Sequence, residues 1–386
     1  MMKNKKLVLI IGGILLYLAS SGISFALFNY LGGPSLGLLS PLHDGKGGFI
    51  IDPEAPKTEA CPLNGKMFSK AERRIWETRR PLTVMIENHA ESRPQSGLSS
   101  ADIVYEAIAE GGITRFLAVF YCGAGQEVTI GPVRSARTYF MDFASEYGDY
   151  PLYAHVGGAN KPGKADALGQ IGNYGWLRKG NDMNQFSLGF PVFWRDYERL
   201  GHPVATEHTM YSTTQKLWEV AKKRELTNVD DEGNAWDENF VVWKFKDDKK
   251  EEDRGNVDKI SFEFWENGTD YAVNWKYDKG SNQYARTNGG SGYIDKNDDS
   301  QVKAKTVVVQ YMKETGPIDE LKHLLYRTTG SGSAIVFQDG EAIKGTWEKD
   351  ERESRTTFAD SKGKEISFNG GPIWIEIIPI GSEVSY

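Results

Sequence analysis

The sequence predicts an α+β fold, in which a mixed helix–strand segment is followed by a β-rich segment and preceded by one transmembrane helix. Three observations support this. An uncharged apolar run stands near the amino terminus. Short apolar runs then alternate with two amphipathic segments up to about residue 246. From residue 260 onward, short apolar runs are separated by Gly, Asn and Asp turns.

The composition places the chain among folded, acidic proteins. It has 386 residues, a length typical of about two domains, and 39% of them are apolar. The net charge is −7 and no basic stripe is present, so nucleic-acid binding is not expected. Cys61 and Cys122 could form a disulfide outside the cytoplasm, although their spacing does not demand one.

The amino-terminal segment indicates membrane attachment. Three lysines in the first six residues precede residues 7–31, which carry no charge and are long enough to span a bilayer. The lysines favour the cytoplasmic side, which leaves the rest of the chain outside. A signal peptide cleaved near Ser24-Phe25-Ala26 is the alternative. We therefore expect a single-pass protein of the cell membrane with extracytoplasmic soluble domains.

Composition shifts suggest the domain boundaries. Residues 1–32 form the basic tip and signal anchor, and residues 33–78, rich in Gly, Pro and polar side chains, are expected to be a flexible tether. Residues 79–246 form the α+β domain and residues 247–259 a charged linker. Residues 260–386 form the β-rich domain.

Apolar periodicity predicts the elements of the first domain. Gly111-Gly112 lies between two apolar runs, which favours a β-hairpin. Apolar residues at helical spacing follow Arg134, which favours a helix there. The expected strands are 82–86, 103–109, 115–121 and 152–156, and the expected helices are 134–147 and 213–224.

Several blocks of the sequence resemble the YerB-like lipoprotein family, a two-domain bacterial family without an assigned function. The matching blocks are residues 79–89 (RRPLTVMIENH), 93–98, 101–106, 110–118 (EGGITRFLA), 131–137 (GPVRSAR), 153–158, 345–349 and 374–375. The resemblance implies a layered α/β sandwich-like first domain, a separate β-rich second domain, and an extracytoplasmic life at the membrane.

Two features depart from the family pattern. The family usually carries a lipid-attachment cysteine, whereas no cysteine lies in or just after this apolar run. The family also tends to have Pro and Asn around a histidine where this chain has Glu207 and Thr209, beside His208. This puts any role tied to that Asn in doubt.

Arg134 and Arg137 are the candidate anion-binding pair. They lie three residues apart where a helix is expected to begin, and helix amino ends favour anions. Two guanidiniums on one face could hold a phosphate or carboxylate in a bidentate manner. The alternative is that both arginines pair with carboxylates of their own domain.

The predicted hairpin supplies such carboxylates. With Gly111-Gly112 as a two-residue turn, Glu110 faces Ile113 and Glu106 faces Leu117. Glu106, Glu110 and Arg115 then share one sheet face. This face is either a structural network or the floor of a cleft. A slip of one residue in the register would abolish the arrangement.

Three histidines, His89, His155 and His208, lie near the matched blocks. His155 ends a strand where a loop opens, so it and Glu106 are the candidate bases if the chain is an enzyme. His208 joins the candidate ligand-binding residues Arg115, Glu110, Arg134 and Arg137. No two histidines share helix or strand spacing and no paired-cysteine motif occurs, so neither a metal nor a cofactor is expected.

Two functions fit these features. The first is an envelope protein that binds an anionic wall polymer or a partner of the wall-building machinery. The second is an envelope hydrolase or transferase acting on a phosphorylated or glycan substrate. No nucleophile elbow, phosphate-binding loop or dinucleotide fingerprint is present, so the sequence leaves the existence of an activity open.

Overall fold

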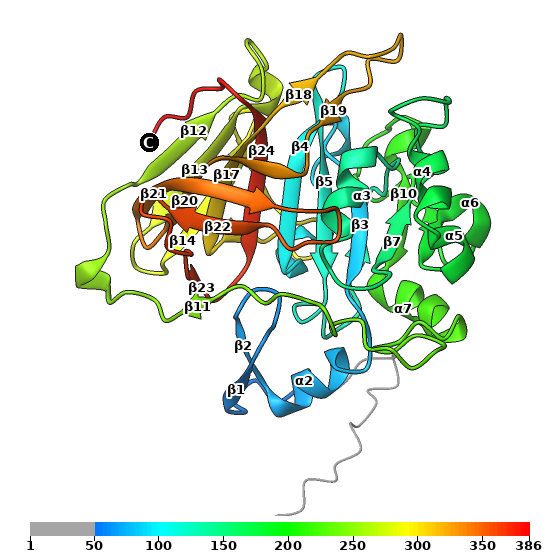
Figure 1. Cartoon of the computed structure of the whole chain (residues 1–386), viewed down its shortest axis with the longest axis horizontal. Coiled ribbons are helices and arrows are strands. Elements are labelled where there is room, and N and C mark those ends of the chain that lie inside the picture. Colours follow the sequence, from blue (N-terminus) through cyan, green and yellow to red (C-terminus); the bar gives the residue numbers. More distant parts are fainter. Residues whose placement is uncertain (1–50) are drawn as a thin grey trace, which may run out of the picture. The chain divides into compact units, whose positions relative to one another are not determined.

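The computed structural model describes residues 51–386. Strands from both halves of this part of the chain meet in one ten-stranded sheet at its centre (Figure 1). β4, from the segment expected as the α+β domain, pairs in parallel with β24, from the segment expected as the β-rich domain, and this pairing joins the two segments. In order across the sheet, the strands are β22 (Thr357–Asp360), β21 (Glu341–Lys349), β20 (Gly330–Gln338), β17 (Thr306–Met312), β24 (Ile373–Pro379), β4 (Ile103–Glu110), β5 (Ile113–Phe120), β3 (Leu82–Glu87), β7 (Leu152–His155) and β8 (Asp182–Asn184).

The basic tip, the apolar run 7–31 and the first part of the expected tether lie outside the described residues. Within residues 51–386, no helix has both the length and the apolar character needed to cross a bilayer. The transmembrane helix therefore stays a prediction from the sequence.

The second segment is β-rich, as expected, and it also forms a smaller sheet. Burial alternates along its middle strands, β13 and β14, so one face of this sheet packs against the rest of the protein. Its strands are β12 (Lys259–Phe262), β13 (Val273–Asp278), β14 (Gln283–Asn288), β15 (Ser291–Gly292) and β16 (Lys303–Ala304).

Helices gather beside β3, β7 and β8, at the right of Figure 1. The last of them, α7, agrees with the expected helix 213–224, and the side chain of Thr213 caps it by accepting from the Lys216 N–H. The helices are α3 (Thr138–Ala144), α4 (Ala167–Asn173), α5 (Trp176–Lys179), α6 (Gln185–Leu188) and α7 (Thr214–Lys223).

The helix expected over residues 134–147 is shorter at its start than predicted. Residues before Thr138 are extended, because Val133 bridges to Ile86 of β3 and Ala136 bridges to Gly158. Arg134 therefore lies outside α3, and Arg137 is its N-cap residue without a side-chain capping bond. The expectation that both arginines lie on one helix face was wrong.

The expected tether is folded from residue 57 onward. A short hairpin is followed by a helix whose start is fixed by a reciprocal capping box between Ser69 and Glu72. These elements are β1 (Lys57–Ala60), β2 (Met67–Ser69) and α2 (Lys70–Trp76).

Short strand pairs complete the described fold. In the charged segment 247–259, Lys249 pairs with Glu341 at 2.7 Å, so this linker is held against β21. One small sheet has the order β6 (Thr129–Ile130), β10 (Met210–Thr213) and β9 (Trp194–Arg195); the two remaining pairs are β11 (Phe245–Lys246) with β23 (Phe368–Asn369) and β18 (Glu314–Thr315) with β19 (Leu325–Tyr326).

Candidate functional site

A β-bulge at Ala109 separates the two glutamates of the hairpin. Glu110 pairs with Ile113 as predicted, but Ile108 pairs with Thr114, so Ala109 is an extra residue on β4. Glu106 consequently pairs with Phe116 rather than with Leu117. Because paired residues share a face, Glu106 and Glu110 lie on opposite faces of the sheet, and the predicted common charged face was wrong.

On one face, Glu110 is shared between Arg115 and Arg137. Arg115 Nη2 lies 2.8 Å from Glu110 Oε1, and Arg137 Nε lies 2.8 Å from Glu110 Oε2. Burial opposes ionisation of Glu110, but the charges of the two guanidiniums outweigh it and lower its pKa to about 2. Both arginines are buried and paired, so neither presents a free guanidinium to an external anion.

On the other face, Glu106 belongs to a fully buried ion cluster. Arg286 of β14 lies between Glu106 of β4, at 2.5 Å, and Glu376 of β24, at 2.8 Å. Thr114 and Asn88 donate to the remaining oxygen of Glu106. Burial and the nearby Glu106 carboxylate raise the pKa of Glu376 well above its usual value. None of the three ionisable side chains has exposed surface, so Glu106 is placed to hold the central sheet and the smaller sheet together.

His155 is also closed off from solvent. Its Nδ1 lies 2.6 Å from the carbonyl oxygen of Gly157, and its Nε2 lies 2.6 Å from Asp182 Oδ1. Its side chain has no exposed surface. Both ring nitrogens therefore have protein partners, and the histidine fixes the junction of β7 and β8.

The predicted residues Arg134 and His208 meet at a carboxylate that the sequence analysis did not single out. Glu87, the last residue of β3, lies 3.0 Å from Arg134 Nε through Oε1 and 2.8 Å from His208 Nδ1 through Oε2. The hydrogen bond to Glu87 raises the pKa of His208. We call Glu87, His89, Glu91, Arg134 and His208 the Glu87 cluster.

Two further side chains complete the cluster. The imidazole of His89 stacks on that of His208, with ring centroids 4.8 Å apart and an angle of 18° between the planes. Glu91 Oε2 lies 3.7 Å from His208 Nε2. The Glu91 side chain is 64% exposed and that of Arg134 is 25% exposed. The Glu87 cluster is therefore open to solvent, unlike Glu106 and His155, whose side chains have no exposed surface.

Local backbone structure explains how three segments build this cluster. The extended segment before α3 runs beside β3, and the Arg134 N–H donates to the Met85 carbonyl. The next strand along, β10, is held to the same segment by a bond from the Val133 N–H to the Met210 carbonyl. His208 ends a short 3₁₀ turn, Thr206–His208, just before β10. Glu87, His89 and Glu91 follow one another at alternate positions, a signal that sequence reasoning could have used.

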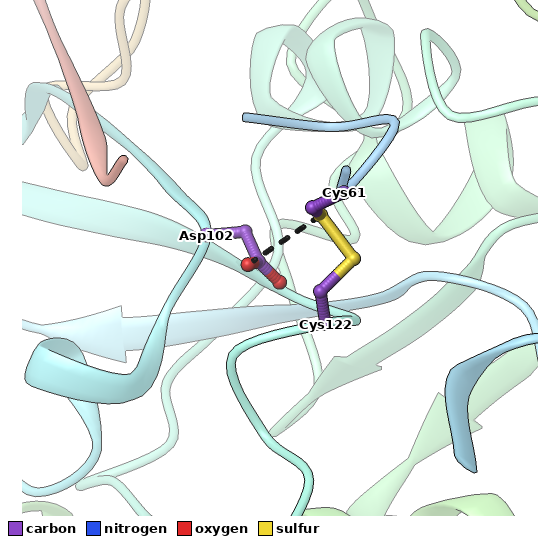
Figure 2. Close-up of side chains that lie close together, drawn as sticks. All are labelled: Cys61, Asp102 and Cys122. Carbon is purple, nitrogen blue, oxygen red and sulfur yellow. Dashed lines mark hydrogen bonds between the residues drawn. A yellow bond between two sulfur atoms is a disulfide. The ribbon is translucent and has the colours of Figure 1, made fainter. Parts of the chain in front are cut away.

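A disulfide joins Cys61 to Cys122 and so ties the amino-terminal hairpin to the end of β5 (Figure 2). The sequence had left this pairing open. Both residues are buried, at 1% exposed surface each. Cys61 Sγ also lies 3.9 Å from Asp102 Oδ1, but the two sulfurs are bonded to each other and are not available as metal ligands.

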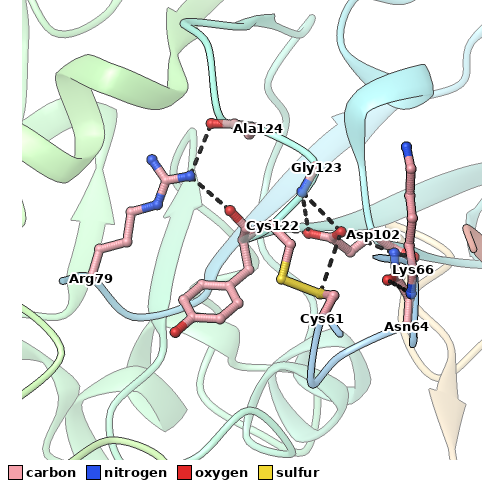
Figure 3. Close-up of a disulfide and its surroundings, with 9 residues drawn as sticks. Cys61, Asn64, Lys66, Arg79, Asp102, Cys122, Gly123 and Ala124 are labelled. Atoms are coloured by element: carbon pink, nitrogen blue, oxygen red, sulfur yellow. Dashed lines mark hydrogen bonds between the residues drawn. A yellow bond between two sulfur atoms is a disulfide. The ribbon is translucent and has the colours of Figure 1, made fainter. Parts of the chain in front are cut away.

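Asp102 organises the backbone around this disulfide (Figure 3). Its carboxylate accepts from the N–H groups of Tyr121 and Gly123, at 2.7 and 3.0 Å, and from Asn64 Nδ2 at 2.9 Å. Burial raises the pKa of Asp102 to about 6 even though these donors favour the charged form. The carboxylate is 1% exposed, which indicates a structural role.

Comparison with known proteins identifies the family. Residues 69–227 match the model of the N-terminal domain of a protein family of unknown function, DUF3048, and residues 260–375 match the model of its C-terminal domain. The chain is 29% identical over 334 residues to YerB of Bacillus subtilis (strain 168), described as a candidate lipoprotein; the match covers 85% of this chain and 88% of the relative.

A solved structure supports the same assignment. The crystal structure of the YerB protein from Bacillus subtilis matches with a TM-score of 0.67 and 26% sequence identity, over 85% of this chain and all of that one. Both halves of the fold therefore have a counterpart in a solved relative. The chain belongs to the DUF3048 family of YerB-like proteins, in agreement with the resemblance of its sequence blocks.

Proposed function

We propose that this chain is a non-catalytic protein of the cell envelope, held at the membrane by residues 7–31, that binds a protein partner of the wall-building machinery. The observation that carries this proposal is a group of exposed apolar side chains on α5, on α6 and just after α6. Leu177, Phe186 and Phe190 are 61%, 77% and 84% exposed. Phenylalanines with so much exposed surface are typical of interaction sites.

These side chains belong to one region of the fold. α5 and α6 both contact β8, the edge strand of the central sheet, and both lie at the right edge of Figure 1. Phe190 follows the C-cap residue of α6, Gly189, and lies four residues after Phe186. We call Leu177, Phe186 and Phe190 the α5–α6 face. A partner that buries this face would remove about 25 cal/mol of unfavourable hydration per Å² of apolar surface.

The three candidate arginines are already ion-paired with glutamates of the same chain, which favours a protein partner over an anionic polymer. Arg115 and Arg137 share Glu110, and Arg134 is paired with Glu87. An incoming anion would have to compete with carboxylates already in place. For the alternative, a hydrolase or transferase, the two proposed bases Glu106 and His155 lack exposed surface, which supports a binding role over a catalytic one.

The disulfide and the relative support the proposed location. Disulfides between buried cysteines form and persist in oxidising compartments such as the bacterial envelope. The relative YerB is described as a candidate lipoprotein, a class of protein attached to the outer face of a membrane. A reporter enzyme that works only outside the cytoplasm, fused after Tyr386, should be active; an inactive reporter would refute the proposed orientation.

Crosslinking in living cells tests the proposed partner. A photoreactive residue placed at position 186 or 190 of the full chain should capture an envelope protein of wall synthesis. Placed at Ile380, which is 67% exposed outside the α5–α6 face, it should not. The double variant Phe186→Ser and Phe190→Ser should abolish the complex, whereas Arg134→Ala should leave it intact. Capture of lipid alone, or loss of binding in Arg134→Ala with binding retained in the double variant, would overturn the proposal.

A further inference from the structure

We propose that His89, Glu91 and His208 bind a divalent transition-metal ion, with Zn²⁺ as the best fit, and that Glu87 positions His208 for this role. One ligand atom from each of the three residues lies within 4.8 Å of those of the other two. Two imidazoles and one carboxylate are the donor set of several zinc sites that keep a fourth position open to water. The inference is independent of the proposed partner and contrary to the sequence-based expectation of no metal.

The pair formed by His208 and Glu91 supplies the main geometric argument. His208 Nδ1 faces a carboxylate oxygen of Glu87 at 2.8 Å and donates its proton there, so in the neutral imidazole Nε2 carries the lone pair. That lone pair faces Glu91 Oε2 at 3.7 Å, which is too long for a good hydrogen bond. With metal–ligand bonds of about 2.1 Å, two ligands of a tetrahedral ion lie about 3.4 Å apart. A small contraction would therefore place a metal between them.

Glu87 provides the outer support that metal-binding histidines usually have. A ligand histidine commonly donates its second ring N–H to a carboxylate, which fixes the tautomer and the ring orientation. Glu87 is 3% exposed and is itself held by Arg134 at 3.0 Å. It can thus hold the imidazole of His208 in one orientation. This role is one of positioning, because Glu87 contacts the histidine and not the metal.

Proximity and charge add two supports. One ring nitrogen of His89 lies within 4.8 Å of the ligand atoms of His208 and Glu91. Its Nδ1 accepts from the Glu91 N–H at 3.2 Å, and its ring is nearly parallel to that of His208, so the His89 ring has to turn to share an ion with His208. The nearby charged groups are Glu87, Glu91, Glu207, Arg134 and Arg115, and the carboxylates outnumber the guanidiniums by one. A divalent cation would balance this excess, whereas an external anion would increase it.

The surroundings allow a metal ion to enter. His89 is half-buried and Glu91 is exposed, so the site opens to solvent on their side, while His208 and Glu87 form its buried floor. Side chains of mixed burial with an open side are typical of sites that retain a water ligand. The structure thus supplies three protein ligands, a positioned histidine and an access route.

Metal titration of the purified full-length chain, stripped with a chelator, tests the inference. Zn²⁺ should bind in competition with a chelating dye at one ion per chain, and Co²⁺ should give absorption bands of a tetrahedral site. Zn²⁺ should also raise the Tm, because it binds the folded state. Glu91→Gln and His89→Gln should each weaken binding at least tenfold, and Glu87→Gln should weaken it about 10–100-fold.

The controls keep the result interpretable. His202→Gln and Glu263→Gln remove an exposed histidine and an exposed glutamate elsewhere, and should bind Zn²⁺ like the parent chain. His208→Gln removes a buried side chain and could unfold the protein, so the test relies on Glu91→Gln, whose exposed side chain is not needed for folding. Unchanged Zn²⁺ binding in Glu91→Gln and His89→Gln, or no binding by the parent chain, would overturn the inference.

Discussion

Glu106 and Glu110 lie four positions apart on one strand yet point to opposite faces of the sheet, because Ala109 forms a bulge between them. Without the bulge, residues at such even spacing would share a face. The bulge thus sends one carboxylate to Arg286 of the smaller sheet and the other to Arg115 and Arg137. One ion cluster therefore fixes the smaller sheet to one face of β4, and the other fixes the start of α3 to the opposite face.

Glu110→Gln should destabilise the fold by about 3–5 kcal/mol at neutral pH, because it removes the carboxylate that is hydrogen-bonded to two buried guanidiniums. The pKa of Glu110 is lowered from 4.5 to about 2, so its contribution is complete above pH 4.5 and is lost as the pH falls toward 2. Urea unfolding measured from pH 7 to pH 2.5 should show the difference between parent and variant shrinking below pH 4.5. A difference that stays constant down to pH 2.5 would contradict this assignment.

Glu376→Gln should change the free energy of unfolding by less than about 1 kcal/mol, although the side chain is completely buried. Burial and the nearby Glu106 carboxylate raise the pKa of Glu376 well above its usual value, which favours the neutral carboxyl in the fold, and an amide can replace a neutral carboxyl. The glutamine oxygen can still accept from Arg286 and Trp275, as the carboxyl does.

The matched control for this prediction is the double variant Glu106→Gln and Glu376→Gln. It removes both carboxylates and leaves Arg286 as an unpaired buried cation, which should cost about 3–5 kcal/mol. Chemical denaturation gives the free energy of unfolding of each variant and so shows whether Glu376→Gln alone is tolerated. If Glu376→Gln alone is as damaging as the double change, Glu376 is ionised in the folded protein.

The strands could be predicted because their apolar runs are a local signal in the sequence. The bulge at Ala109 could not be predicted in this way. The Gly111-Gly112 turn and the pairing of Glu110 with Ile113 followed from the sequence. Ala109, however, is an ordinary strand residue, and nothing in its neighbours marks it as extra. The start of α3 was misplaced for a related reason: the segment with Arg134 and Ser135 resembles a helix start, but bridges to distant residues hold it extended.

The candidate site was harder to predict, because its contacts join residues far apart in the chain. Glu87 and His208 are separated by 121 positions, and no periodicity links them. Arg134 and His208 were singled out individually, but the carboxylate between them was not. The family resemblance, by contrast, rested on long contiguous blocks, and the family models confirm it.

His155 and Asp182 should behave as a structural pair. His155→Gln and Asp182→Asn should each lower the free energy of unfolding by about 1–3 kcal/mol, since each leaves a buried polar partner unsatisfied. Neither change should alter crosslinking through the α5–α6 face once the variants are folded. Differential scanning calorimetry and the crosslinking assay measure the two effects, and unchanged stability in both variants would argue against a structural role.

Loss of the disulfide should destabilise the protein by roughly 2–4 kcal/mol, because the bond closes a loop between residues 61 positions apart and restricts the unfolded chain. Reversible unfolding of the parent chain in urea should shift to lower concentration when a reductant is present. The variant Cys61→Ala and Cys122→Ala should unfold at low urea concentration with or without the reductant. Because the sulfurs are buried, the native chain should also resist reduction until it unfolds. A parent chain that unfolds at the same urea concentration under both conditions would show that the bond does not stabilise the fold.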